Sequence, residues 1–310
     1  MTITSAPAGL RRAAHRLLTA AVAGMLLATA AVAATDGPAR AAGYTGPHPG
    51  TFTGLGFDTC AAPTGAQMTA WLQSPYRAIG IYIGGVNRGC AQANLTKEWV
   101  ANQQAKGWRF FPLYVGLQAP CTTYQRRIDP AQAAAQGRAA ADDAVTKARG
   151  LGLAQRSTII LDMERYPSGN AACSTAVLTF TSAWTARLHD HGYLSGLYTN
   201  TRSAGLADHV GAYAQPGHIR PDVLDFANWD GVQTTSDPTI PANHWVPKRR
   251  MKQYQGDHYE TWGGVKLNID SNYLDIEVPM TRYRSATVTP TRPSSRAAGF
   301  GPFRTAGATR

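Results

Sequence analysis

The chain has 310 residues, enough for one large domain, and a formal net charge of +11. The excess charge lies at the ends: residues 1–41 hold four Arg against one Asp, residues 280–310 hold six Arg and no acid, and residues 42–279 carry 20 basic and 18 acidic residues. A nucleic-acid-binding domain gathers basic residues on its folded face, so this distribution argues against nucleic acid as the partner.

Residues 1–42 have the features of a cleaved signal peptide in the usual order. Arg11, Arg12 and Arg16 form a basic start, and the run from Leu17 to Ala34 is apolar and uncharged. Two small-x-small cleavage sites are present, Ala31-Val32-Ala33 at the end of this run and Ala39-Arg40-Ala41 after it. The run is too Ala-rich to favour a permanent membrane anchor. The Arg pair hints at twin-arginine export, but the apolar pair expected after it is missing, so the Sec and twin-arginine routes both stay open.

Residues 53–279, after a linker at 43–52, alternate short apolar runs with helix-like segments. This alternation predicts parallel strands joined by crossover helices. The runs that we expect to be strands are Leu55–Asp58, Ala78–Ile83, Arg109–Val115, Thr158–Asp162, Leu194–Tyr198, Val223–Trp229, Arg250–Tyr254 and Leu267–Asp270. Eight strands in a chain of this length predict an α/β fold, a single-domain (β/α)8 TIM-type barrel. An open doubly wound sheet is the alternative, but no glycine-rich dinucleotide loop supports it.

The helices between these strands are predicted from their end signals. Asp129 and Pro130 are a capping residue and a proline at the first helical position, and Gly150 is the expected left-handed stop of that helix. The next helix has one apolar stripe and ends at Gly192. Its stripe consists of Val177, Phe180, Thr181, Trp184 and Leu188. A weaker helix is expected around residues 201–214.

The C-terminal segment differs in composition from the predicted barrel. Beyond Tyr283 it consists mostly of Thr, Pro, Ser, Arg, Ala and Gly, with Phe300 and Phe303 as its large apolar side chains. Such a segment buries too little apolar surface to offset the entropy of ordering it. We therefore predict a disordered basic tail over residues 280–310.

The clearest candidate site follows the fourth predicted strand, where an apolar run ends in Asp162, Met163 and Glu164. Side chains two positions apart in a strand point to the same face, so the two acids should lie side by side. At the C-terminal end of a barrel strand, that face looks into the mouth where active sites lie. Of two close carboxylates one tends to keep its proton, and a proton donor beside an anion is what cleavage of a glycosidic bond requires. The alternative is that Asp162 caps the following helix and Glu164 is an ordinary loop acid.

Two further acids stand at equivalent places. Asp58 ends the first predicted strand and Asp270 ends the last. Because the first and last strands are neighbours in a closed barrel, these acids could converge near the same axis as the central pair. Alone, each is equally typical of a turn or cap residue.

Aromatic residues fit the same arrangement. Tyr82, Tyr114, Tyr198 and Trp229 each fall late in a predicted strand, where they could form the floor of a cleft. Aromatic faces stack on sugar rings, although core packing is at least as common a role for any one of them. Gln253 could hydrogen-bond a substrate or join a buried network.

These motifs resemble a known group of enzymes. The strings Gly56-Phe57-Asp58, Asp162-Met163-Glu164, Gly196-Leu197-Tyr198-Thr199, Gln253-Tyr254 and Asp270 occur in the order seen in family 25 glycoside hydrolases, secreted lysozymes that act on peptidoglycan. The strings Gly56-Phe57-Asp58-Thr59-Cys60 and Tyr82-Ile83-Gly84-Gly85 are closer to an actinobacterial glycoside-hydrolase-like group, domain-of-unknown-function family 1906. This resemblance covers about residues 53–278.

The resemblance implies roles for the four acids. Glu164 would be the proton donor, Asp162 its partner, and Asp58 and Asp270 supporting acids. With an N-acetylated glycan, Asp162 would instead orient the acetamido group for substrate-assisted attack.

The four cysteines all follow the predicted signal peptide. An even number in an exported chain suggests two disulfides, and without Cys-x-x-Cys spacing zinc and thioredoxin-like sites are poor alternatives. The Cys-bearing segments fall in successive loops at the expected mouth, a departure from the lysozyme pattern. We pair Cys60 with Cys90 and Cys121 with Cys173.

Two functions remain open at this point. The first is a secreted or cell-envelope glycoside hydrolase that cleaves peptidoglycan or a related polysaccharide, with Glu164 as general acid. The second is a non-catalytic glycan-binding or envelope-organising protein on the same barrel. A phosphodiesterase would need paired His residues or a metal shell that the sequence does not offer. We expect a monomer with no cofactor, no metal and, after signal cleavage, no permanent membrane span.

Overall fold

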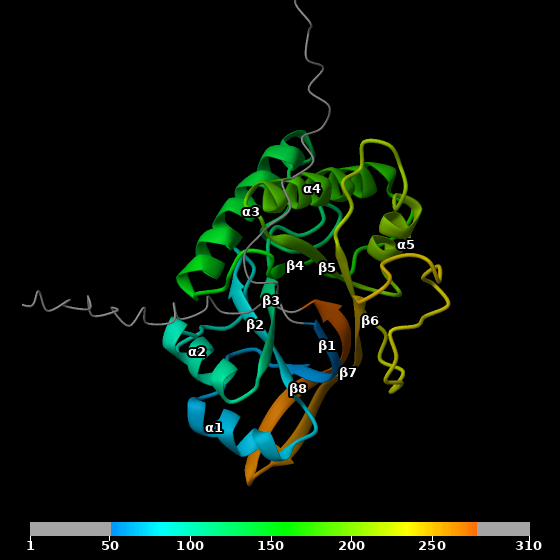
Figure 1. The fold of residues 1–310 in the computed structure, drawn as a ribbon. Coiled ribbons are helices and arrows are strands. Elements are labelled where there is room, and N and C mark those ends of the chain that lie inside the picture. The colour runs from blue at the N-terminus through cyan, green and yellow to red at the C-terminus, as the bar shows by residue number, and fades with distance from the viewer. Residues whose placement is uncertain (1–50, 278–310) are drawn as a thin grey trace, which may run out of the picture. The chain divides into compact units, whose positions relative to one another are not determined.

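Eight strands close into one barrel in the order β1 to β8 in the computed structural model, which describes residues 51–277 (Figure 1). The predicted signal peptide, nearly all of the linker and the basic tail lie outside the described residues. The closed barrel confirms the predicted TIM-type fold. It excludes the open doubly wound sheet, because β8 hydrogen-bonds to both β7 and β1.

All eight predicted strands are present, with some changes at their ends. They are β1 Thr51–Asp58, β2 Ala78–Gly84, β3 Arg109–Tyr114, β4 Thr158–Asp162, β5 Leu194–Asn200, β6 Val223–Ala227, β7 Arg249–Trp262 and β8 Val265–Glu277. The first seven pair in parallel around the barrel. Because β6 ends at Ala227, Trp229 lies in the following loop and not in the strand as predicted.

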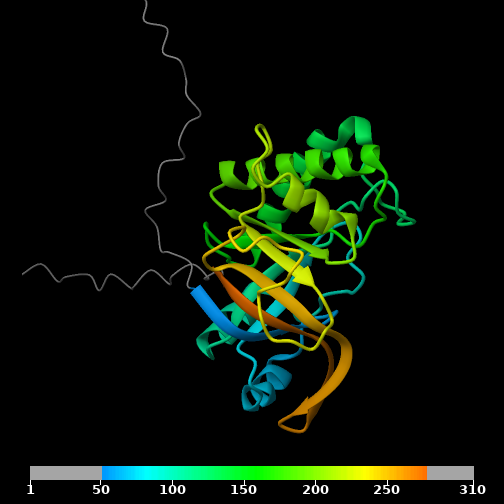
Figure 2. The ribbon, with the colours of Figure 1, turned by 90° about the vertical axis from the view of Figure 1, so that its right-hand side faces the viewer.

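The eighth strand departs from the regular (β/α)8 pattern. Strands β7 and β8 form a hairpin that turns at Gly263 and Gly264, with φ angles of 57° and 78° that suit glycine. Strand β8 is therefore antiparallel to both β7 and β1. The predicted end of the last strand at Asp270 is wrong, because Asp270 lies inside a longer strand. Figure 2 shows this hairpin extending away from the rest of the barrel.

Five α-helices lie between the strands up to β6. They are α1 Gly65–Ala70, α2 Lys97–Ala105, α3 Ala133–Gly150, α4 Ala171–Asp190 and α5 Ala204–Gly211, with 3-10 turns at Trp71–Gln73 and Pro130–Gln132. Helices α3 and α4 lie side by side over one wall of the barrel in both ribbon views (Figures 1 and 2). In the described part of the chain, no helix combines the length and apolar character needed to cross a bilayer.

The end signals of the helices are confirmed with one correction. The Asp129 carboxylate accepts a hydrogen bond from the Ala131 amide at 3.0 Å, as a capping residue does. The left-handed residue after α3 is Gly152, with φ of 79°, and not Gly150, which still belongs to the helix. Gly192 follows α4 with φ of 76°, as predicted. Helix α5 is shorter than the segment 201–214.

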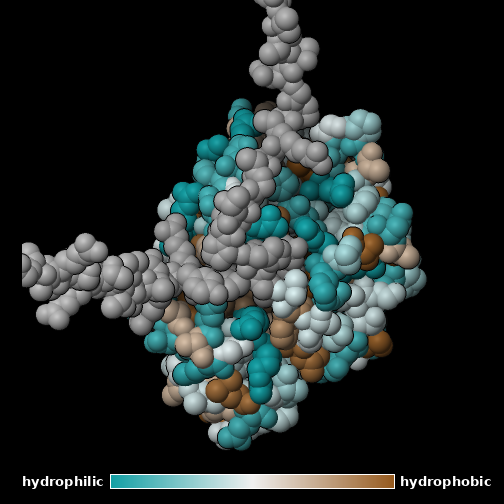
Figure 3. Space-filling view, viewed as in Figure 1, coloured by the Kyte–Doolittle hydropathy of each residue, from teal (hydrophilic) through white to brown (hydrophobic). Residues whose placement is uncertain are grey.

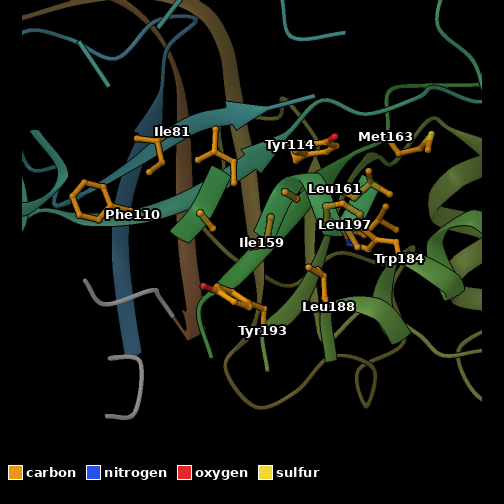
Figure 4. Packing of buried hydrophobic residues seen from close by; sticks show 14 of the residues in the cluster. Ile81, Phe110, Tyr114, Ile159, Leu161, Met163, Trp184, Leu188, Tyr193 and Leu197 are labelled. Carbon is orange, nitrogen blue, oxygen red and sulfur yellow. The ribbon is translucent and has the colours of Figure 1, made fainter. Parts of the chain in front are cut away.

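The apolar side chains form two main layers, because neighbouring residues of a strand face opposite sides of the barrel wall. The smaller set, which faces the barrel interior, consists of Ala78, Phe111, Leu113, Ile160, Val223, Met251, Leu274 and Ile276. The larger set lies between the strands and the helices, where the predicted stripe of α4 packs against β4 and β5. Figure 4 shows Trp184 and Leu188 of α4 beside Leu161 and Leu197.

The face of the molecule in Figure 3 is mostly hydrophilic, with hydrophobic residues in separate spots. This pattern agrees with an apolar content that is gathered in the buried clusters.

Close contact between α3 and α4 depends on the absence of a side chain at Gly137, where a Cβ would overlap the carbonyl oxygen of Phe180. We expect Gly137→Ala to push the helices apart and lower the free energy of unfolding by about 1–3 kcal/mol. Urea denaturation measures this change. Gly150→Ala is the matched control, because a Cβ there meets nothing within 4 Å. Equal unfolding midpoints for the two variants would contradict the role of Gly137.

Candidate active site

Four predicted acids converge on one pocket at the C-terminal end of the parallel strands. Asp58, Asp162, Glu164 and Asp270 all line this pocket, which has a volume of about 320 Å³. Asp58 ends β1 and Asp162 ends β4. Asp270 reaches the same level because the antiparallel register pairs it directly with Asp58. The hairpin thus places Asp270 where the end of a parallel strand would have placed it.

The central pair keeps strand alternation for two residues beyond β4. Asp162 and Glu164 both face the pocket, while Met163 between them is fully buried in the outer apolar layer. Asp162 is 5% exposed and Glu164 is partly exposed. The side-by-side arrangement predicted from the spacing is therefore present.

Gln118, a residue that the sequence analysis did not single out, holds this segment in place. Its amide nitrogen donates to the carbonyl oxygen of Asp162 at 2.8 Å, and its amide oxygen accepts from the backbone nitrogen of Glu164 at 2.8 Å. The side chain is completely buried. Because a lone glutamine in a loop is usually a surface residue, no local signal marks this role.

Asp58 is held by three hydrogen bonds from neutral donors. Tyr82 Oη donates to Oδ1 at 2.8 Å, Asn272 Nδ2 donates to Oδ2 at 2.8 Å, and Gln253 Nε2 donates to Oδ2 at 3.2 Å. Asp58 is 3% exposed, so these donors replace water around its carboxyl group.

Gln253 connects the acids to two aromatic side chains. Its Nε2 donates to Asp270 Oδ2 at 3.2 Å as well as to Asp58. Its Oε1 accepts from Tyr198 Oη at 3.2 Å and from Trp229 Nε1 at 3.0 Å. Gln253 is buried, and its Nε2 and Oε1 atoms each take part in two of these hydrogen bonds. Gln253 therefore joins a buried network, one of its two predicted roles.

Trp229 lies at the edge of the site and remains 59% exposed. Its ring is nevertheless held in place, because its indole nitrogen bonds to Gln253 and its six-membered ring lies against Gly256, where any Cβ would overlap it. An exposed aromatic face that is fixed on two sides is suited to stacking on a flat ligand.

The aromatic predictions divide according to which face of the barrel wall each side chain takes. Tyr82 and Tyr198 line the innermost part of the site. The prediction for Tyr114 is wrong. Its ring packs against Trp184 in the outer layer, with the ring centroids 5.4 Å apart, and its hydroxyl donates a hydrogen bond to Asp143 at 3.0 Å. Leu113, the preceding residue, takes the inward position on β3, so alternation turns Tyr114 outward.

The two predicted disulfides are confirmed. Cys60 pairs with Cys90, and Cys121 pairs with Cys173. The first bridge borders the pocket, where Cys60 and Cys90 both contribute to the wall. Cys173 lies in the first turn of α4 and not in a loop, so the second bridge ties the loop after β3 to that helix.

Burial and mutual repulsion raise the pKa values of the acids. Burial and then repulsion from Asp270 raise the pKa of Asp58 to about 7. Burial, with repulsion from Glu164, Asp58 and Asp225, raises the pKa of Asp162 well above its usual range. Burial also raises the pKa of Glu164. The ion pairs found among residues 51–277 do not include Asp58, Asp162 or Glu164. Burial also raises the pKa of Asp270, and the nearby His258 offsets only part of this rise.

These raised pKa values favour the protonated forms of the crowded carboxyls. A protonated carboxyl can act as a general acid, and an ionised neighbour can stabilise developing positive charge or attack as a nucleophile. Across residues 51–277, no group of three or more His, Cys, Asp or Glu residues is placed to hold a metal ion.

Comparison with known proteins identifies the domain. The family model for the Rv2525c-like, glycoside hydrolase-like domain matches residues 69–274. No curated protein matches the chain.

Solved structures are similar to the chain at low sequence identity, and the first of those described here shares its fold. The Tat-secreted protein Rv2525c of Mycobacterium tuberculosis, solved with L-tartrate, has a TM-score of 0.52 and 10% identity over 73% of this chain and 99% of that one. An uncharacterized B. stearothermophilus protein has a TM-score of 0.48 and 18% identity over 71% of this chain and 95% of that one. A family 25 glycosyl hydrolase from Bacillus anthracis has a TM-score of 0.45 and 14% identity over 75% and 94% of the two chains.

Repulsion between Asp58 and Asp270 generates a testable pH effect. Asp270→Asn removes a negative neighbour, which favours ionisation of Asp58, so the pKa of Asp58 should fall below its value of about 7. Carbon-detected NMR titration of the Asp58 carboxyl measures the shift. Asp275→Asn is the matched control, because Asp275 lies elsewhere on β8 and forms an ion pair with Lys248. An unchanged Asp58 titration in Asp270→Asn would rule out this coupling.

Proposed function

The chain belongs to the Rv2525c-like, glycoside hydrolase-like domain family, and on this basis we propose that it hydrolyses glycosidic bonds of a cell-wall or related polysaccharide. The observation that carries the proposal is the pair Asp162 and Glu164, which faces one pocket with raised pKa values. Because one fold hosts many functions, the chemistry of this pair and not the barrel supports the reaction.

Exposure and hydrogen bonding support different proposed tasks for the acids. Glu164 is the most suitable proton donor, because it is partly exposed and can reach the oxygen of a leaving group. Asp162 is buried beside it and acts as its partner, stabilising positive charge or orienting a substituent of the substrate. Asp58 and Asp270 support the pair, and Gln253 fixes both of them with one amide group.

The walls of the site supply contacts suited to sugars. Trp229 offers an exposed ring at the edge, and Tyr82 and Tyr198 place hydroxyl groups next to the acids. Aromatic faces with a few fixed polar groups are typical of carbohydrate sites. This composition supports a polysaccharide as the substrate, and the motif order shared with family 25 lysozymes favours peptidoglycan.

We place the protein in the cell envelope or outside the cell. The signal-like segment at 1–42, two disulfides, and the fold shared with a Tat-secreted mycobacterial protein support export. A chain with its positive charge at the ends and a nearly neutral middle also suits an anionic wall better than a nucleic acid.

Glu164→Gln tests the hydrolase directly, because it removes the acidic proton and keeps the size of the side chain. We expect the rate of sugar release from purified peptidoglycan to fall by about a hundredfold or more, with cooperative unfolding retained. Glu98→Gln is the matched control, because Glu98 lies exposed in the first turn of α2.

Two results would decide between catalysis and binding. Sugar release by the parent and by Glu98→Gln, but not by Glu164→Gln, would establish the hydrolase. Binding of peptidoglycan by all three proteins with release by none would overturn hydrolysis of that substrate, and would favour a glycan-binding protein on the same barrel.

Gly256 provides a separate test of the Trp229 surface. Gly256→Ala fits the backbone but displaces the Trp229 ring, so we expect glycan binding to weaken about three- to tenfold. Isothermal titration with a soluble peptidoglycan fragment measures the affinity. Gly211→Ala, at a position with nothing within 4 Å, is the control.

If Gly256 acts through Trp229, the double variant Gly256→Ala/Trp229→Ala should bind no more weakly than Trp229→Ala alone. Additive losses would show that Gly256 contributes by another route.

A further inference from the structure

A recess of about 60 Å³ lies among the inward-facing side chains of the candidate active site. Its walls include Asp162 of β4 and Asp225 of β6, and Tyr198 of β5 is the register partner of both. Asp225 therefore lies level with the central acid pair, two strands from Asp162. Asp225 was not among the predicted site residues, although an acid inside the apolar run Val223–Ala227 is unusual in a buried strand.

Asp225 is 2% exposed, and its Oδ1 atom has no hydrogen-bond partner. Oδ1 of Asp162 shares this condition. Buried polar atoms are normally paired, because leaving one unpaired loses the hydrogen bonds it makes to water. Because both residues line the same small recess, their two unpaired oxygens point to a ligand group that is not part of the chain.

Asp237, another buried acid, has the hydrogen bonds that Asp225 lacks. Asp237 is 6% exposed, and it accepts from Thr239 and Asn228 through three hydrogen bonds. The carboxylate of Asp237 thus stabilises the fold through hydrogen bonds, whereas Oδ1 of Asp225 makes no hydrogen bond within the fold. At neighbouring inward positions the barrel uses apolar residues such as Leu113 and Met251.

We infer that the recess is a subsite in which Asp225 and Asp162 receive one uncharged substituent of a substrate sugar that carries a hydrogen-bond donor. This inference rests on the proposed glycan-binding role of the site. A volume of about 60 Å³ matches about two waters, so a hydroxyl or amide substituent fits, whereas a whole sugar ring does not. The unpaired carboxyl oxygens accept from an O–H or N–H group of that substituent.

The charge of the site favours an uncharged substituent over an ammonium group. Burial and repulsion from Asp58 raise the pKa of Asp225 well above its usual range, so its protonated form is favoured more than that of an ordinary Asp. A protonated carboxyl both donates and accepts, which suits a hydroxyl or amide. Burying an ammonium group would cost more, because such a neutral partner does not balance its charge.

The experiment measures binding in the Glu164→Gln background, so that hydrolysis cannot consume the probe. Isothermal titration would compare tetrasaccharides of β-1,4-linked glucose, N-acetylglucosamine and glucosamine, which present a hydroxyl, an amide and an amine. We expect Asp225→Leu to weaken binding of the hydroxyl or the amide sugar about tenfold or more, because it fills the recess and removes the acceptor. Asp225→Asn, which keeps size and hydrogen bonding, should stay within about threefold of the parent.

Stability provides a second, independent readout. We expect the urea midpoint to rise in Asp225→Leu, because an unpaired buried carboxyl is replaced by an apolar side chain. Asp237→Asn, the matched control, should lower the midpoint, because its bonds are used by the fold. Weaker binding together with higher stability cannot come from structural damage.

Three results would overturn the subsite. The first is parent-like binding by Asp225→Leu. The second is an equal loss of binding in Asp225→Leu and Asp225→Asn together with lower stability, and the third is that the Glu164→Gln parent binds none of the sugars. Tightest binding of the amine sugar would overturn the uncharged character of the ligand. If the parent hydrolyses no glycan but binding depends on Asp225, the subsite stands and the hydrolase fails, so the two proposals are separable.

Discussion

The closing of the barrel by β8 is the constraint on which the candidate site depends. This strand runs antiparallel between β7 and β1, and its register brings Asp270 opposite Asp58. The same strand supplies Asn272, which donates a hydrogen bond to Asp58. Asn272 is also the register partner of Gln253 in the neighbouring strand β7. A regular parallel eighth strand would reach the site only with the residues at its C-terminal end. In the hairpin, residues from within β8 line the pocket, among them Asn268 and Asp270.

Crowded carboxyl groups are the electrostatic consequence of that closure. Five acids line one recess: Asp58, Asp162, Glu164, Asp225 and Asp270. Neutral side-chain donors bond to two of them, Asp58 and Asp270. Because these donors carry no full charge, they hold the carboxyls in place without making them all ionise. Repulsion between close carboxyls opposes their ionisation and so favours protonated forms. Hydrolysis would use those protons, and the proposed subsite would use the unpaired oxygens.

Local signals predicted most of the fold and much of the site. Apolar runs and end signals identified the eight strands, the capping residue before α3 and the end of α4, because these depend on neighbours in sequence. The direction of β8 could not be predicted in this way, because it depends on pairing between distant segments. Tyr114 was misplaced because its position near the end of β3 does not reveal which face it takes. Gln118 was missed because its partners lie more than forty residues away.

By itself, the sequence determined that acids stand at the ends of apolar strands, that the Asp162 and Glu164 side chains share a face, and that four cysteines follow a signal-like segment. These features follow from strand periodicity and local composition. Only the tertiary structure decided that Asp225 joins the other acids, that Gln253 binds both Asp58 and Asp270, and that Trp229 rests on Gly256. The physical reason is that desolvation, repulsion and hydrogen bonding act between groups close in space, and barrel closure sets which residues become close.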